Sequence, residues 1–210
     1  MQILLHLLVL IAGYLCGSFP TGYLVARLWR GVDVRKIGSG RTGGTNVLRS
    51  AGVGPAAVTV VGDIAKGYLA VMLAQVILGT PLASALGGVA AIFGHNHSIF
   101  LQGLGGAGSM TNVGVLMALS PLVAALAGLG SIPVLAIWRF ASLGSITLAV
   151  LTLLSLLVGV LWGQLPAEYL LYGLLSSAMI VYELRPNIQR LLAGKERKIG
   201  EAAPGGVEGY

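Results

Sequence analysis

The residues from 37 to 49 carry the types of group that bind phosphate. They read Ile-Gly-Ser-Gly-Arg-Thr-Gly-Gly-Thr-Asn-Val-Leu-Arg, with four glycines, three hydroxyls, one amide and two guanidinium groups. Glycine lets backbone N–H groups approach an anion, and arginine can clamp two of its oxygens. Gly38-x-Gly40-x-x-Gly43 matches a dinucleotide-binding pattern, but that pattern requires a preceding strand, and an apolar helical run precedes it here. The segment predicts a phosphate site, with a flexible polar loop as the alternative.

A second glycine-rich turn lies at residues 103–112. It reads Gly-Leu-Gly-Gly-Ala-Gly-Ser-Met-Thr-Asn and opens an apolar stretch that predicts a helix. The N–H groups and the dipole at a helix N-terminus hold anions, which makes this turn a second candidate phosphate site. Packing between helices is the alternative, because small residues in membrane helices often serve that purpose.

Ionisable residues also lie inside or at the end of apolar stretches. Asp63 and Lys66 are three residues apart, hence on one face of a helix. Charged groups within a bilayer usually mark function, and a purely structural ion pair is the alternative. His95 and His97 are spaced i, i+2, which suits a helical metal pair poorly. We therefore predict no metal site and no cofactor.

Two further segments bring polar groups next to apolar stretches. Arg139 precedes Ser142 and Ser145, and Arg185 precedes Asn187. Both arginines could instead be anchors that extend their charged ends toward water. No Ser-His-Asp or Cys-His arrangement for a nucleophile is evident. Polar groups from at least four segments are thus predicted to meet at one face of a membrane.

The composition defines the elements that must position these groups. Of 210 residues, 56% are apolar and only 10% are charged, and glycine adds another 32 residues. A soluble chain of this size would lack the polar residues to cover its surface, so a soluble enzyme, a nucleic-acid-binding domain and a disordered chain are excluded. Cys16 is the only cysteine, which excludes an intrachain disulfide. The sequence predicts an all-α, polytopic membrane helix bundle.

Apolar stretches long enough to cross a membrane run at 3–28, 53–78, 81–101, 110–138, 142–163 and 165–184. Six basic residues lie between Arg27 and Arg49, and five lie between Arg185 and Lys198. Short cytoplasmic loops retain Lys and Arg, so both regions are expected in the cytoplasm and the N-terminus outside. An odd number of spans is then needed. A break in 110–138 near Gly128–Ser131 gives seven.

Residues 1–200 are accordingly expected to form one integral-membrane domain, followed by a Gly/Pro-rich flexible tail at 201–210. The net charge of +6 is interpreted as an orientation signal and an attraction to anionic lipid headgroups. It does not indicate nucleic acid. The expected location is the bacterial cytoplasmic membrane, with the site facing the cytoplasm.

With these motifs the chain resembles a known family, the PlsY-type bacterial acyl-phosphate:glycerol-3-phosphate acyltransferases. The most specific similarity is between residues 38–49 and the family's S-G-N-x-G-A-T-N-x-x-R motif. The other matching segments are Gly17–Pro20, Asp63-x-x-Lys66-Gly67, Gly94-His95, 105–111, Arg139–Ser145, Asn187-Ile188 and Gly194–Glu196. The resemblance runs almost end to end, and it agrees in order and spacing.

The resemblance implies transfer of an acyl group from acyl phosphate to the sn-1 hydroxyl of glycerol 3-phosphate, giving lysophosphatidic acid and phosphate for phospholipid biosynthesis. It implies seven helices and a reaction without an acyl-enzyme. The expected partners besides the substrates are membrane lipids, and no obligatory protein partner is expected. By the same resemblance the catalytic residues are Ser39, Asn46, Arg49 and Lys66. Those that bind substrate or phosphate are Gly40, Arg41, Thr45, His95, Gly105, Gly106, Gly108, Thr111, Arg139, Ser142 and Asn187.

Three positions depart from the family pattern. Arg41 replaces an asparagine, Ala107 replaces a lysine of the second loop, and Leu184 replaces a histidine. Arg41 or His97 could compensate in space. These departures motivate an alternative, a divergent or inactive paralogue with another polar acceptor. A small transporter that uses Asp63 and Lys66 is a further alternative, although transporters often contain internal repeats and no convincing repeat is found.

Overall fold

The protein is an all-helical bundle in the computed structural model, which describes residues 1–201. The long helices are α1 (Gln2–Ser18), α4 (Val53–Ile77), α5 (Pro81–Asn96), α6 (Ser109–Leu119), α7 (Pro121–Trp138), α8 (Ala141–Leu161) and α9 (Glu168–Glu183). Shorter helices are α2 (Thr21–Arg30), α3 (Gly44–Ala51) and α10 (Arg185–Leu192), with the 3₁₀ turns η1 (Val34–Lys36) and η2 (Ile99–Leu101). The expected all-α class is confirmed, and no strand occurs in residues 1–201.

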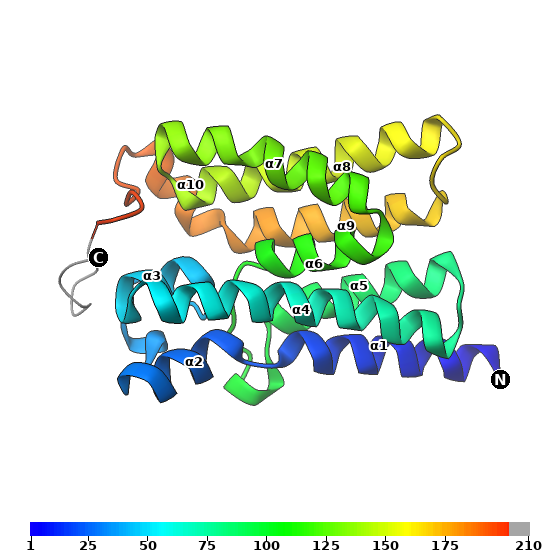
Figure 1. Cartoon of the computed structure of the whole chain (residues 1–210), viewed down its shortest axis with the longest axis horizontal. Coiled ribbons are helices and arrows are strands. Elements are labelled where there is room, and N and C mark those ends of the chain that lie inside the picture. Colours follow the sequence, from blue (N-terminus) through cyan, green and yellow to red (C-terminus); the bar gives the residue numbers. More distant parts are fainter. Residues whose placement is uncertain (202–210) are drawn as a thin grey trace.

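The helices run roughly along one axis in two groups (Figure 1). One group contains α1, α4 and α5, the other contains α7, α8 and α9, and α6 lies between them (Figure 1). Short helices α2, α3 and α10 gather at the end of the bundle opposite the N-terminus (Figure 1). We call this end the loop end and the opposite end the turn end. Connections at the turn end are short, such as the one between α4 and α5.

Four segments of the described chain are long and apolar enough to cross a membrane: Gln2–Arg30, Val53–Ile77, Pro121–Trp138 and Ala141–Leu161. Many large apolar side chains on these segments are exposed, including Leu129 and Val76. A surface of this kind suits lipid rather than water. Helices α5 and α9 have 16 residues each and α6 has 11, so they are shorter than an ordinary span.

The predicted break near Gly128–Ser131 is wrong. The structure keeps these residues inside α7 and separates α6 from α7 at Ser120 instead. The Ser120 hydroxyl accepts a hydrogen bond from the backbone N–H of Val123, and Pro121 occupies the first turn, where a missing N–H costs nothing. Pro133 is tolerated within α7. A serine cap followed by proline is therefore the signal that ends one helix and starts the next.

Two other boundaries differ from the expectation. The stretch predicted at 3–28 is interrupted at Phe19–Pro20, between α1 and α2. The segment from 44 to 51, expected to be part of a loop, forms helix α3. Of the predicted tail at 201–210, residues 202–210 lie outside the described residues.

Small residues let the helices of the first group approach α6 closely. A Cβ on Gly114 would lie 1.9 Å from the backbone oxygen of Ile64, and one on Gly67 would lie 2.2 Å from the oxygen of Thr111. Since no larger residue fits at either position, the glycines set the α4–α6 distance. This packing holds Asp63 and the start of α6 in fixed positions relative to each other.

Candidate functional site

Two cavities of about 290 Å³ each lie at the loop end. The first has polar walls from α3, α8 and α10 and apolar walls from Val60, Leu135 and Leu184. The second is lined by charged and polar side chains such as His97 and Glu183, together with Leu104 and Gly105. Ser39 and Arg41 line both cavities, so the first glycine-rich segment forms the boundary between them.

Three helices begin at the wall of the first cavity. Gly43–Thr45 at the start of α3, Gly108–Met110 at the start of α6 and Ala141-Ser142 at the start of α8 all line it. In the described chain none of these three N-termini has a side-chain cap. Helix N-termini carry partial positive charge and uncapped N–H groups. Their convergence makes the first cavity suited to an anion with several oxygens.

Asn46 shapes the first glycine-rich segment with its side chain. The amide oxygen accepts from Ser39 N (3.0 Å), and the amide nitrogen lies within 3.0 Å of the backbone oxygens of Val34, Ile37 and Arg41. The side chain is only 2% exposed. Asn46 thus holds residues 34–41 in one conformation. The positions of Ser39 and Arg41, which belong to this segment, depend on it.

A surface ion pair secures the same segment on its other side. Asp33 accepts from the guanidinium and the backbone N–H of Arg35, which also stacks on Tyr23 at 4.7 Å. The hydrogen bond from Arg35 lowers the pKa of Asp33 to about 2. Asp33 is therefore ionised at any pH near neutral, and it neutralises one of the two arginines at the second cavity.

The second glycine-rich turn packs directly against the first. Thr42 N donates to Gly105 O (3.1 Å), and Gly106 N donates to His95 O (3.0 Å). A Cβ on Gly106 would lie 2.2 Å from His95 Nε2, so only glycine fits there without displacing the ring. The two turns are therefore in direct contact, a closer arrangement than the shared membrane face that the sequence predicted.

Asp63, Lys66 and His95 form a buried polar cluster beside these turns. Lys66 Nζ lies 2.8 Å from Asp63 Oδ1 and donates to Phe19 O, the carbonyl exposed by the break between α1 and α2. His95 Nδ1 lies 3.6 Å from the same carboxylate oxygen. Asp63 and His95 line the first cavity, whereas Lys66 does not. The predicted pairing of Asp63 with Lys66 is confirmed.

Arg41 crosses from the first loop to the end of α9. Its guanidinium donates to Asn187 Oδ1 (2.9 Å) and to the backbone oxygen of Glu183. Burial lowers the pKa of Arg41, but a guanidinium remains protonated at any physiological pH. Ala107 and Leu184, two of the departures from the family pattern, instead lie in an apolar cluster with Ile180. Arg41 therefore provides a cation beside two apolar residues.

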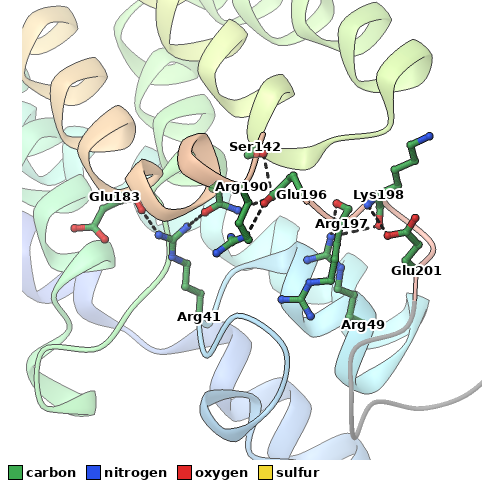
Figure 2. Close-up of polar contacts among 10 residues, drawn as sticks. Arg41, Arg49, Ser142, Glu183, Arg190, Glu196, Arg197, Lys198 and Glu201 are labelled. Carbon is green, nitrogen blue, oxygen red and sulfur yellow. Dashed lines mark hydrogen bonds and ion pairs between the residues drawn. The ribbon is translucent and has the colours of Figure 1, made fainter. Parts of the chain in front are cut away.

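The C-terminal segment folds back over the site (Figure 2). Glu196 accepts from Ser142 Oγ (3.1 Å), Asn187 Nδ2 (2.7 Å) and Arg190 Nε (2.7 Å). Arg49 donates to the backbone oxygens of Arg197 and Lys198, and Arg139 donates to that of Ile199. We call residues 195–200 the C-terminal strap. It connects α3 with the starts of α8 and α10.

The structure brings most predicted site residues together. Nine of them line the first cavity: Ser39, Arg41, Thr45, Asn46, Arg49, His95, Gly108, Ser142 and Asn187. Gly40 and Gly105 line the second cavity. Four others are in the lining of neither cavity: Lys66, Gly106, Thr111 and Arg139.

Sequence reasoning missed two contributors. Glu196 was noted only as the end of the resemblance, although a carboxylate among five basic residues of the C-terminal region suggested a partner nearby. The open N-termini of α3 and α8 were not expected either. The absence of Ser, Thr, Asp or Asn at Gly43 and Phe140, just before these helices, was the available signal.

Comparisons with known proteins agree with this geometry. The family model described as glycerol-3-phosphate acyltransferase matches residues 7–194. The chain is 44% identical to glycerol-3-phosphate acyltransferase 2 of Moorella thermoacetica, covering 93% of this chain and 98% of that protein. It is 42% identical to the glycerol-3-phosphate acyltransferase of Synechococcus elongatus, covering 92% and 94%.

A solved structure has the same fold. The crystal structure of PlsY, an integral membrane glycerol 3-phosphate acyltransferase, in its glycerol 3-phosphate form superposes with a TM-score of 0.85 at 34% identity, covering 93% of this chain and 96% of that one. Its lysophosphatidic acid form gives 0.84. The protein is thus an integral membrane helix bundle, and the chain belongs to the glycerol-3-phosphate acyltransferase family.

Proposed function

We propose that the protein transfers an acyl group from acyl phosphate to the sn-1 hydroxyl of glycerol 3-phosphate. The hydroxyl oxygen bonds to the acyl carbonyl carbon, the bond from that carbon to the phosphate oxygen breaks, and the hydroxyl proton ends on the leaving phosphate. The products are lysophosphatidic acid and inorganic phosphate. The observation that carries the proposal is the convergence of three uncapped helix N-termini on the first cavity.

Both substrates carry phosphate, so the reaction requires anion binding and alignment. The open N–H groups of α3, α6 and α8, with Ser39, Thr45 and Arg49, are proposed to bind phosphate oxygens. The apolar wall at Val60 and Leu135 suits the first carbons of an acyl chain. Acyl phosphate is already activated, so positioning and stabilisation of the developing negative charge suffice for its chemistry.

The remaining predicted residues receive roles according to their contacts. Arg41, Ser142 and Asn187 are proposed to bind the polar part of a substrate at the boundary of the cavities, with Gly40, Gly105 and Gly108 as the surrounding backbone. Asn46 shapes the loop. Lys66 is proposed to act through Asp63 on His95, and Gly106 to hold that ring. Arg139 is proposed to anchor the C-terminal strap, and Thr111, buried in the first turn of α6, to place its backbone against Gly67 of α4.

We further propose seven membrane crossings within one domain, formed by α1 with α2, then α4, α5, α6, α7, α8 and α9. The N-terminus is then outside and the loop end faces the cytoplasm, as the clustered basic residues favour. A Cys16→Ser background with single cysteines at Thr80 or Lys36 tests this. A membrane-impermeant maleimide applied to intact cells should label position 80 and not position 36. Labelling of position 36 alone would show that the orientation is the opposite of the proposed one.

The activity is tested with purified protein, lipid, radiolabelled glycerol 3-phosphate and palmitoyl phosphate. We expect labelled lysophosphatidic acid without any added protein partner, and none with palmitoyl-CoA as the donor. Ser39→Ala should lower the rate at least about tenfold, the loss of one hydrogen bond to a charged group. Absence of product, or product from palmitoyl-CoA alone, would overturn the proposal.

The second candidate function is acyl transfer to a different polar acceptor. The apolar cluster that contains Ala107 and Leu184 favours it. Competition assays with other polyol phosphates distinguish the two. Preference for glycerol 3-phosphate over every competitor would reject this second candidate.

A further inference from the structure

The Asn187 side chain lies between two groups of opposite charge, Arg41 and Glu196. Its amide oxygen accepts from Arg41, 2.9 Å away, and its amide nitrogen donates to Glu196, 2.7 Å away. Glu196 comes from the C-terminal strap, 9 residues after Asn187, and Arg41 comes from the first loop, 146 residues before it. Asn187 therefore connects two segments that are distant in the sequence. The three side chains form one chain of hydrogen bonds.

The direction of this chain follows from the chemistry of its ends. An ionised carboxylate only accepts hydrogen bonds and a guanidinium only donates them. The amide between them satisfies both in one orientation alone, with its NH₂ group toward Glu196 and its oxygen toward Arg41. Turning the amide over would place NH₂ against the guanidinium and oxygen against the carboxylate. Glu196 therefore selects the orientation that holds Arg41.

The carboxylate is itself firmly held. The Glu196 side chain is 4% exposed, and its two oxygens accept from Asn187 and Ser142 on one side and from Arg190 on the other. Buried networks of this kind fix side-chain geometry when every member is satisfied. Arg41 lies at the other end of the chain, at the boundary of both cavities.

We infer that Glu196 is a positioning residue that acts through Asn187 on Arg41 and so aims this guanidinium at a substrate phosphate. The inference rests on the proposed function, which makes Arg41 a phosphate ligand. Glu196 also borders the first cavity and accepts from Ser142. Its inferred effect on Arg41 runs through the orientation of the Asn187 amide.

Glu196→Gln is the direct test, because a glutamine can donate as well as accept and no longer imposes one orientation on Asn187. We expect KM for glycerol 3-phosphate or acyl phosphate to rise about tenfold, the effect of one hydrogen bond to a charged group, with a smaller change in kcat. Glu201→Gln is the matched control, since it removes the same charge from an exposed carboxylate next to the strap, one that accepts from Lys198 N. It should behave as the wild type.

A double-mutant cycle with Arg41→Ala separates positioning from general stabilisation. If Glu196 acts through Arg41, Glu196→Gln should change KM less than about twofold once Arg41 is gone, because coupled residues are not additive. A purely structural Glu196 would give the same loss in both backgrounds, and that result would overturn the inference.

The exchanged pair Asn187→Asp with Glu196→Gln places the carboxylate at position 187, where it can only accept, from Arg41 on one side and from the new glutamine amide on the other; it also covers the case in which the single variant does not fold. It should bring KM to within about threefold of wild type, since an oxygen acceptor is again the only group that can face Arg41. A KM as high as that of Arg41→Ala would contradict the inference. An inactive wild type would instead refute the proposed function.

Discussion

Two helices that begin at the turn end differ from three that begin at the loop end. At the turn end, α5 and α7 start with a hydroxyl cap followed by proline: Thr80 accepts from Ala83 N and Ser120 accepts from Val123 N. At the loop end, α3, α6 and α8 start after Gly43, Gly108 and Phe140, with no side-chain cap in the described chain. The first arrangement satisfies the N–H groups internally, and the second leaves them facing a cavity.

The difference shows where stability and function lie. A cap stabilises a helix by about 1 kcal/mol, and a helix without one forgoes that contribution. At the loop end the uncapped N-termini come together with Arg41 and Arg49, so their positive ends add to the charge of the guanidiniums. Changes at the loop end are therefore expected to affect activity most, whereas changes at the turn end are expected to affect stability alone.

The largest effect is expected from Asn46→Ala. Loss of the amide frees the backbone oxygens of Val34, Ile37 and Arg41 and the N–H of Ser39 together. Several buried hydrogen bonds are lost, so kcat/KM should fall at least about 100-fold. Acyl transfer with palmitoyl phosphate measures this. Activity within a few-fold of wild type would mean that the loop keeps its shape without Asn46.

A smaller loss is expected from Gly106→Ala. The added Cβ would displace the buried His95 ring, which lies next to Asp63. We therefore expect activity to fall about tenfold. Overpacking should also lower the free energy of unfolding by roughly 1–3 kcal/mol. Gly128→Ala in α7 is the control, because a Cβ there meets nothing within 4 Å. Equal behaviour of the two variants would show that the ring moves freely.

The smallest effects are expected at the turn end. Thr80→Ala and Ser120→Ala should each lower the free energy of unfolding by about 1 kcal/mol through loss of a cap. Activity per folded molecule should not change. Thermal unfolding in detergent and the acyl-transfer assay check the two halves of this prediction. A drop in specific activity without loss of stability would remove the distinction between the ends.

Much of the site was predictable because its residue types are unusual for a membrane helix bundle. The glycine, hydroxyl and guanidinium groups of residues 38–49 identified the first loop, and Asp63 with Lys66 identified the buried pair. These signals are local in the sequence, and they require no knowledge of how the helices pack.

The remainder depended on packing between distant segments. No spacing rule connects Glu196 with Ser142, or Arg41 with Asn187, because these contacts form only when the strap and the first loop fold onto α8 and α10. The position of the α6–α7 break was missed for a different reason. Two glycines and a serine at 128–131 suggested a turn, but these residues remain helical within α7. The break lies instead at Ser120, which caps α7, followed by Pro121 in its first turn.

Binding of radiolabelled glycerol 3-phosphate to Gly43→Asp tests the central claim, that the open helix N-termini hold phosphate. Gly43 has an extended backbone (φ −76°, ψ 160°), and a Cβ there meets nothing within 4 Å, so an aspartate fits as a cap of α3. Gly43→Ser is the uncharged control. We predict that the aspartate weakens binding at least about tenfold and that the serine weakens it less, because both cap N–H groups of α3 but only the carboxylate adds a like charge. Equal binding by all three proteins would contradict the account.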